Sequence, residues 1–385
     1  MSHAEEHGRR AVLLHRRERG PIVRQWGRPL PAARDFGHSG CMSQPSLDPI
    51  ASLRLTSRTS TRPDDSLILA SDLASAFGAD FRLRREETRG RLQRVSRGLY
   101  YPSARWKQLR EDERYLIRVR GAALSRRGQA VLSHHSAAVF WDLPMLIGWP
   151  SDVHLLTERA TGGRSDPGIR RHALGIDARD VTTVEGLLVT TIERTVVDLA
   201  ATLDLKSAVA LVDRALYQDR FGRTPTLTTK DALLATLERM LPFRGSRRAR
   251  AIIQFGTDLS GSPAESASRV NIALSGFPEP ELQHPFIVDG KECETDFYWL
   301  EIDGVGECDG RDKYFNPEFL SGRTPEQVQY DEKLREDGIR RQVHGFARWP
   351  ASVGMSQYPL RRKLLELGLQ PGPQRVLRGL ERPKP

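Results

Sequence analysis

The chain has 385 residues, of which 38% are hydrophobic, so it is long enough for two or three domains with folded cores. No apolar run reaches the roughly 18 residues of a membrane span, and the N-terminal run AVLL is cut short by HRRERG, which argues against a signal peptide. The net charge of +10 suggests a polyanionic partner, but residues 1–63 hold eleven Arg and five acids, whereas residues 64–385 hold 48 basic and 44 acidic residues. Net charge alone therefore says little about the folded part.

The cysteine content excludes two further classes of protein. Cys41, Cys293 and Cys308 are an odd number without a CxxC pair, so neither a disulfide framework nor a structural zinc site is indicated. A reducing compartment fits this usage. We expect a soluble cytoplasmic protein without a membrane partner.

Residues 1–63 show no sustained hydrophobic periodicity and are rich in Arg, Pro, Gly and Ser. This composition predicts a disordered basic arm, which is either inert or tracks phosphates on a nucleic acid. Met42 begins a more ordinary stretch, so residues 1–41 could also precede the true start of the protein.

Residues 64–102 have the outline of a winged helix-turn-helix. LILASDLASAF predicts a short helix, ADFRLRREETRGRLQ a second one, and RVSRGLYYP a strand pair or wing that ends at Pro102. In this motif the second helix enters the major groove of DNA. The candidate DNA-binding residues are Arg82, Arg85 and Arg89, which share one face of a helix, together with Arg94 and Arg97. The alternative is a solvated basic face that pairs with Glu86 and Glu87.

Residues 103–256 read as an α+β domain. KQLREDERYLIRVRGAALSRRG predicts a long amphipathic helix and SHHSAAVFWDLP a second helix, followed by the strand-like segments VHLLT, IRRHAL and VTTVEGLLVTT and by further helices. His134 and His135 are adjacent and would point about 100° apart on a helix, so we expect cap or core residues rather than a shared metal site. Arg194 and Asp198 are spaced for pairing on one helix, which is structural by default.

The wing ending RGLYYP, with SHHSAAVFWDLP and VTTIERTVVDLA, makes residues 66–220 similar to the AbiEi-type antitoxin and transcriptional-regulator family. This resemblance implies DNA-binding autoregulation and a toxin or other regulatory partner. Its motifs are structural and imply no reaction.

Residues 257–350 contain an acidic cluster on predicted strands. Asp289-Gly290 and Asp303-Gly304 lie between runs of β-forming residues, as two-residue hairpin loops should, and they predict an antiparallel meander. Glu307 and Asp309 are two apart and therefore share one strand face, and Asp296 lies on the preceding strand.

Three carboxylates that converge on a sheet need a neutralising cation, and oxygen-rich sites suit Mg²⁺ or Mn²⁺. The sequence therefore predicts a metal site at Asp296, Glu307 and Asp309, with the carbonyl of Cys308 as a further ligand. In the alternative, Asp309 merely opens a turn, Glu307 is solvated, and Asp296 pairs with an arginine. Glu265 either helps to place the attacking water or only completes a capping box with Ser262.

The order of these segments, from the helix SPAES through ELQHPF, TDFYW and GECDGRDKY to the helix EQVQYDEKLREDGIRR, resembles the nuclease-like domain related to the very-short-patch repair endonuclease. That group belongs to the PD-(D/E)XK superfamily, and the similarity covers Ser262 to roughly Trp349. It implies that Asp296 and Glu307 are the two metal-binding acids. The usual lysine is replaced by Asp309, and Lys313 would supply the ammonium only if the chain folds back. Gln283, on the strand before Asp296, either positions water or phosphate or is merely exposed.

The expected fold class is α+β: a winged helix-turn-helix, an α+β middle domain and a restriction-endonuclease-like α/β core with a mixed sheet. The expected boundaries are 1–63, 64–102, 103–256, 257–350 and a tail at 351–385. The expected function is hydrolysis of DNA phosphodiester bonds with Mg²⁺ or Mn²⁺. The alternatives are a DNA-binding regulator or antitoxin with a degenerate nuclease-like domain, and an assembly module.

Overall fold

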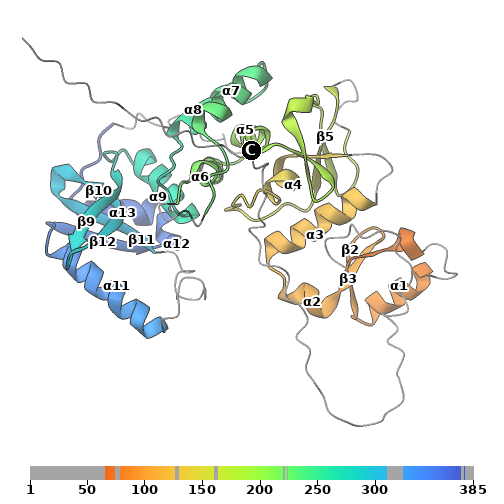
Figure 1. Cartoon of the computed structure of the whole chain (residues 1–385), viewed down its shortest axis with the longest axis horizontal. Coiled ribbons are helices and arrows are strands. Elements are labelled where there is room, and N and C mark those ends of the chain that lie inside the picture. The colour runs from red at the N-terminus through yellow and green to blue at the C-terminus, as the bar shows by residue number, and fades with distance from the viewer. Residues whose placement is uncertain are drawn as a thin grey trace, which may run out of the picture. The chain divides into compact units, whose positions relative to one another are not determined.

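The structure is a computed structural model that describes residues 66–73, 79–125, 130–159, 164–219, 222, 224–309, 324–373 and 377. The predicted basic arm, the second start at Met42 and Lys313 lie outside these residues. Contacts assign Ser46–Pro385 to one compact unit. Helices and three sheets make up its described part, which confirms the α+β class (Figure 1).

The first sheet has the order β1-β3-β2 and is antiparallel. The prediction of a helix for LILASDLASAF is wrong at its start, because Ile68 and Leu69 pair with Tyr100 and Leu99 and are buried there. Strand pairing thus outweighs the local helical pattern. The elements are β1 (Ile68–Leu69), a 3₁₀ helix (Ala70–Leu73), α1 (Ala79–Thr88), β2 (Leu92–Ser96) and β3 (Leu99–Pro102).

The predicted long helix after the first sheet is two helices. The break lies at Arg110, whose backbone N–H donates to the Glu113 carboxylate at 2.7 Å, so Glu113 caps the start of a new helix. Aromatic and aliphatic residues of this second helix pack on the middle sheet. The elements are α2 (Ser103–Gln108) and α3 (Glu111–Leu124).

The middle sheet is mixed and has the order β6-β5-β4-β8-β7. The segment SHHSAAVFWDLP gives only a short helix, which ends at Ala138. The strand-like segments VHLLT, IRRHAL and VTTVEGLLVTT all become strands. The elements are β4 (Val131–Leu132), α4 (His134–Ala138), β5 (Val153–Leu156), β6 (Ile169–His172), a 3₁₀ helix (Ala178–Asp180), β7 (Val181–Val184) and β8 (Leu187–Thr190).

A helical layer follows the middle sheet and encloses an aliphatic core. Thr191, Asp204 and Thr229 each accept a backbone N–H at the start of a helix, as N-cap residues do. The last of these helices ends at Phe255, with Gly256 as its C-cap residue. The elements are α5 (Ile192–Thr202), α6 (Leu205–Leu216), α7 (Lys230–Met240) and α8 (Ser246–Phe255).

The third sheet is mixed, with the order β12-β11-β10-β9, and only the β11–β12 pair in it is parallel. Asp289 and Gly290 have φ values of 50° and 74°, as a tight two-residue hairpin requires. The second predicted hairpin forms, because β10 and β11 pair antiparallel, but its loop is longer than the predicted two residues and contains a 3₁₀ helix at Leu300–Ile302. The elements are α9 (Pro263–Leu274), β9 (Glu281–Val288), β10 (Lys291–Trp299), β11 (Gly304–Asp309), α11 (Pro325–Arg340), β12 (Gly345–Pro350), α12 (Ala351–Gly354) and α13 (Gln357–Glu366).

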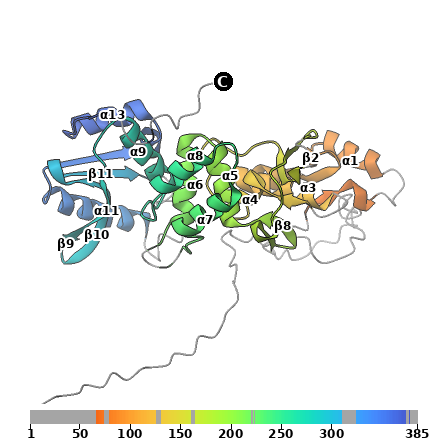
Figure 2. The ribbon, with the colours of Figure 1, turned by 90° about the horizontal axis from the view of Figure 1, so that it is seen from above.

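Helices cover both faces of this sheet. Phe297, Trp299 and Trp349 point to one face, where the core includes residues of α9 and α13, and Tyr298 and Val305 point to the other, where they meet α11 (Figure 2). Because β-strand side chains alternate, the row that contains Asp296 and Glu307 lies on the α11 face.

Helix α9 belongs to two cores. Val270 and Leu274 pack with α5 to α8, whereas Ala264 and Ile272 pack with the third sheet. The predicted boundary at residue 257 therefore precedes a helix that joins both parts. In the described ranges, no helix combines the length and apolarity needed to cross a membrane.

Candidate functional site

The predicted acidic strands are neighbours. Phe297 pairs with Gly306, so one further step of the antiparallel register places Asp296 opposite Glu307. Glu307 in turn pairs with Arg348 across the parallel β11–β12 ladder. Laterally paired side chains share one face of a sheet, so these three residues form a polar row under α11.

Gln283 does not extend this row regularly. Its neighbours on β9 pair with β10 in a register that would set Gln283 opposite Asp296. Its φ of 51°, however, is left-handed and interrupts the ladder at this point. The regular alternation of side chains therefore cannot be applied to Gln283.

The Asp296 carboxylate is tied to the neighbouring strand. Its Oδ2 accepts the backbone N–H of Cys308 at 2.7 Å. The Cys308 thiol lies on the other face of the sheet, 3.7 Å from the Ser268 hydroxyl, and burial raises its pKa to about 12. Cys308 thus meets Asp296 through its backbone, and its thiol stays protonated at neutral pH.

Glu307 is buried and bound by an arginine. Both of its carboxylate oxygens accept from Arg335 Nη2, at 2.9 and 2.8 Å, and the same arginine bonds Glu332 and the carbonyl of Glu294. Burial, with a smaller contribution from nearby Asp296, raises the pKa of Glu307 to about 7 against the attraction of Arg335. Glu307 therefore holds a proton more tightly than an exposed glutamate does.

Asp309 has a different arginine. Arg348 Nε donates to its two carboxylate oxygens at 2.8 and 2.7 Å, and Arg348 Nη1 reaches Glu336 of α11 at 2.5 Å. Glu307 binds Arg335 of α11, and Asp309 binds Arg348, which contacts Glu336 of α11. Both acids therefore lie on the α11 face of the sheet, which confirms the prediction that they share a face. On α11, carboxylates engage both Arg335 and Arg340.

The charge problem of these carboxylates is thus met by guanidinium groups. In the part of the chain that the structure describes, no group of three or more His, Cys, Asp or Glu side chains has the geometry of a metal site. Arg335 donates to both oxygens of Glu307, so a guanidinium group engages this carboxylate in the present arrangement.

Glu265 acts as a capping residue. Its carboxylate accepts the N–H of Gly261 at 2.9 Å, and its own N–H donates to Ser262 Oγ at 3.2 Å. The side chain is buried, with 7% of its surface exposed. Ser262 is thus the N-cap as predicted, but the Glu265 carboxylate caps Gly261 instead of returning to the N–H of Ser262, so the predicted capping box forms only in part.

The N-terminal arginines are displayed on two elements. Arg82 and Arg85 are exposed on α1, and Arg94 and Arg97 are exposed on β2 and in the β2–β3 turn. Arg89 is not on the helix, which ends at Thr88. It lies 3.5 Å from Glu86, the acid that also pairs with Arg91, so the ion-pair alternative holds for this residue.

Phe81 was not among the predicted contacts. It stands on α1 beside Arg82 with 72% of its surface exposed. An aromatic residue in a basic stretch can stack on bases or sugars. The sequence signal was an apolar residue at a helical position next to arginines, a pattern that is equally typical of a core residue.

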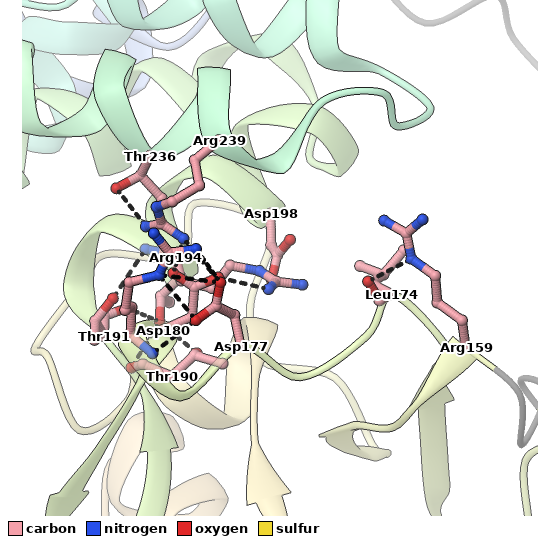
Figure 3. A network of polar contacts seen from close by, with 12 residues as sticks. Arg159, Leu174, Asp177, Asp180, Thr190, Thr191, Arg194, Asp198, Thr236 and Arg239 are labelled. Atoms are coloured by element: carbon pink, nitrogen blue, oxygen red, sulfur yellow. Dashed lines mark hydrogen bonds and ion pairs between the residues drawn. The ribbon is translucent and has the colours of Figure 1, made fainter.

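A second polar cluster lies in the middle domain and links the 3₁₀ helix, α5 and α7 (Figure 3). Arg194 donates to Asp198 at 2.9 Å and to Asp180 at 3.0 Å, and Arg239 donates to Asp180 at 2.7 Å. Arg194 and both acids are almost fully buried. As predicted for Arg194 and Asp198, the cluster is structural: it fixes two helices to the edge of the middle sheet.

Four histidines gather beside this cluster. His134 stacks on His172 with ring centroids 3.6 Å apart, and His154 Nδ1 lies 3.0 Å from His172 Nε2. Burial lowers the pKa of His154 to about 2 and those of His135 and His172 to about 4, so these rings are neutral at pH 7. His134 is a core residue, as predicted. His154 and His172 lie on two strands, and their spacing in the sequence could not show that these strands bring them next to His134.

No family model matches this chain, and no curated protein shows significant similarity to it.

Proposed function

We propose that this protein is a DNA-binding regulator that contacts the duplex through α1 and the β2–β3 hairpin. The observation that carries the proposal is the exposure of four arginines on these adjoining elements: Arg82, Arg85, Arg94 and Arg97. No ion pair holds any of the four among the described residues. Their guanidinium groups are therefore available to phosphates, which dominate the affinity of DNA-binding proteins.

The scaffold behind these arginines supports the proposal. Leu83 of α1 packs with Leu92 of β2 and Tyr100 of β3 in one small core. Helix and hairpin therefore present their basic residues from a common support, as a winged helix-turn-helix does. The resemblance to antitoxin-type regulators adds a toxin or other regulatory protein as the proposed partner.

Under this proposal, the part of the protein that contains the third sheet does not cut DNA. Arg335 and Arg348 neutralise Glu307 and Asp309, and α11 carboxylates bind both arginines in turn. Such a network stabilises the sheet and places guanidinium groups on the oxygens of Glu307 and Asp309 that a metal ion would need.

A metal-dependent DNA endonuclease is the second candidate, and the position of Asp296 opposite Glu307 favours it. Bound Mg²⁺ or Mn²⁺ would supply hydroxide and stabilise charge on a phosphate under attack. Arg335 would first have to release Glu307, because the residues as they stand do not fit the ion. No hydrolytic step is assigned, and Lys313 lies outside the described residues.

The DNA-binding proposal is tested by titrating the full-length chain against labelled duplex DNA at several salt concentrations. Replacing Arg82 and Arg85 by Ala should weaken binding and reduce the log–log salt slope by about 2, because each phosphate contact contributes roughly 1. Arg341 and Arg362, which are exposed elsewhere, provide a control double variant with the same net charge. Equal losses in both double variants would reject α1 as the contact.

The two candidates are separated by incubating the protein with plasmid DNA and Mg²⁺ or Mn²⁺. The regulator predicts no nicking that depends on the metal. Nicking that disappears in Asp296→Ala would establish the nuclease, and nicking that survives this substitution would point to a contaminant or to a site elsewhere.

A further inference from the structure

A cavity of about 500 Å³ lies between α6, the segment after α4 and the start of α9. It is distant in sequence from both the basic hairpin and the acidic strands. Its walls combine an apolar side with one arginine, two carboxylates (Asp112 and Asp142) and several hydroxyl groups. The residues used below are Leu143, Met145, Trp149, Asp142, Arg214 and Tyr217, with the Ser260–Ser262 loop. A volume of this size is typical of small-molecule sites.

Arg214 is the unusual member of this lining. Among the residues that the structure describes, no hydrogen bond or ion pair joins it to another residue, and its buried Nη1 lacks an acceptor. Asp142 and Tyr217 are its electrostatic neighbours, but neither accepts a hydrogen bond from it, and burial lowers its pKa. An arginine that is partly buried without an acceptor is costly, so a bound acceptor would be favourable.

Other buried arginines of this chain have carboxylate partners, although Arg194 Nη2 is also buried without an acceptor. Arg194 is bound by Asp180 and Asp198, and Arg269 lies 2.7 Å from Asp213, the residue that precedes Arg214. The fold thus supplies a carboxylate where the arginine has a structural task. Near Arg214 the carboxylate of Asp142 makes no hydrogen bond to the guanidinium, and both residues line the cavity.

The loop that closes one side of the cavity is held in place. Ser260 Oγ lies 2.9 Å from Ser266 Oγ, and Glu265 anchors Gly261. Ser262 accepts the N–H of Glu265 at the start of α9. The hydroxyl-rich wall is therefore preorganised, which lowers the cost of binding a ligand.

We propose that this cavity binds a small organic oxyanion, a carboxylate or a phosphomonoester, whose charge pairs with Arg214 and whose apolar part lies against Leu143, Met145 and Trp149. A guanidinium offers the forked donors that both oxyanions accept in pairs. The assignment is independent of the proposed DNA contact, because it uses none of the same residues.

The test titrates phenyl phosphate, benzoate and uncharged benzyl alcohol into the full-length protein by calorimetry. We expect saturable binding of at least one of the two anions, at least tenfold stronger than that of the alcohol. Arg214→Gln should weaken that binding by at least about tenfold, as expected for loss of a charge-assisted hydrogen bond. Arg362→Gln, an exposed arginine on α13, should bind as the wild type does. The anion that binds more tightly shows whether the cavity takes a carboxylate or a phosphomonoester.

A second variant tests the assignment from the opposite direction. Asp142 lines the same cavity and has a φ of 52°, a conformation that Asn also adopts readily. Asp142→Asn removes a negative charge near Arg214 and should strengthen oxyanion binding by about two- to fivefold. Anion binding that is absent, that equals the alcohol's, or that survives Arg214→Gln would overturn the proposal. If Arg214→Gln does not fold, unchanged or weaker binding in Asp142→Asn would overturn it alone.

Discussion

Replacing Arg335 by Met removes the cation from a buried carboxylate. Glu307 is 6% exposed and accepts Arg335 Nη2 with both oxygens, whereas Arg335 itself is 23% exposed. Breaking a buried ion pair by deleting one partner costs about 3–5 kcal/mol, and the partial exposure of Arg335 places this case near 3 kcal/mol when Glu307 is ionised. The other contacts of Arg335, with partly exposed Glu332 and with the carbonyl of Glu294, add less.

The cost should depend on pH. The pKa of Glu307 is about 7 in the folded protein and its ordinary value is 4.5, so the folded state binds the proton more tightly. Its contribution to stability is therefore full below pH 4.5 and is lost as pH rises through about 7. At about pH 5 Glu307 is neutral in the folded protein, and Arg335→Met removes only a hydrogen bond worth about 1 kcal/mol. Near pH 8 the carboxylate is charged and the full cost applies.

Urea unfolding, followed by circular dichroism at both pH values, measures this difference. Arg362→Met, which removes an exposed arginine that pairs weakly with Glu366, is the matched control and should stay within about 0.5 kcal/mol of wild type. Glu307→Gln combined with Arg335→Met should abolish the extra cost near pH 8. Destabilisation of the same size at both pH values would refute the ion-pair reasoning.

Three further predictions concern the packing of Gly306, the titration of His154 and the buried ion pair of Arg269. Gly306→Ala should lower the free energy of unfolding by about 1–3 kcal/mol, because an added Cβ would stand 2.5 Å from the Trp349 ring; urea titration measures this, and an unchanged midpoint would contradict the packing. The pKa of His154 falls from 6.5 to about 2 on folding, so the stability of the protein should decline as pH falls below about 6.5. His154→Gln should therefore make the melting temperature depend less on pH between 6.5 and 4, and an unaltered dependence would count against the histidine cluster. Arg269→Met should unfold more easily by about 3 kcal/mol in chemical denaturation, because it leaves Asp213 buried and unpaired, and a loss below 1 kcal/mol would contradict this.

Local signals in the sequence predicted the parts of the fold that rest on local chemistry. Ser262 and Thr324, each followed by Pro, begin α9 and α11 as N-cap residues. Asp289-Gly290 forms the tight hairpin that its sequence predicts. Ile68 and Leu69 became a strand instead of a helix because their partners lie about 30 residues further along the chain, beyond the reach of local patterns.

The acidic residues of the candidate site could be predicted from the sequence, but the arginines that bind them could not. The spacing of Glu307 and Asp309 fixed their common strand face, and their neighbour Asp296 followed from the meander. Arg335 and Arg348 lie 28 and 39 residues beyond the acids that they bind, and only the packing of α11 and β12 on the sheet brings them together. Guanidinium groups and metal ions can both neutralise clustered carboxylates, so the acidic pattern alone could not show which of them is present.

Hydrogen exchange of the full-length chain, measured by mass spectrometry with and without duplex DNA, tests the central claim most directly. Binding through α1 and the hairpin predicts slowed exchange in peptides from Ala79–Thr88 and Leu92–Pro102, with no change across Lys291–Asp309. Slowed exchange confined to the acidic strands, with α1 and the hairpin unaffected, would contradict it.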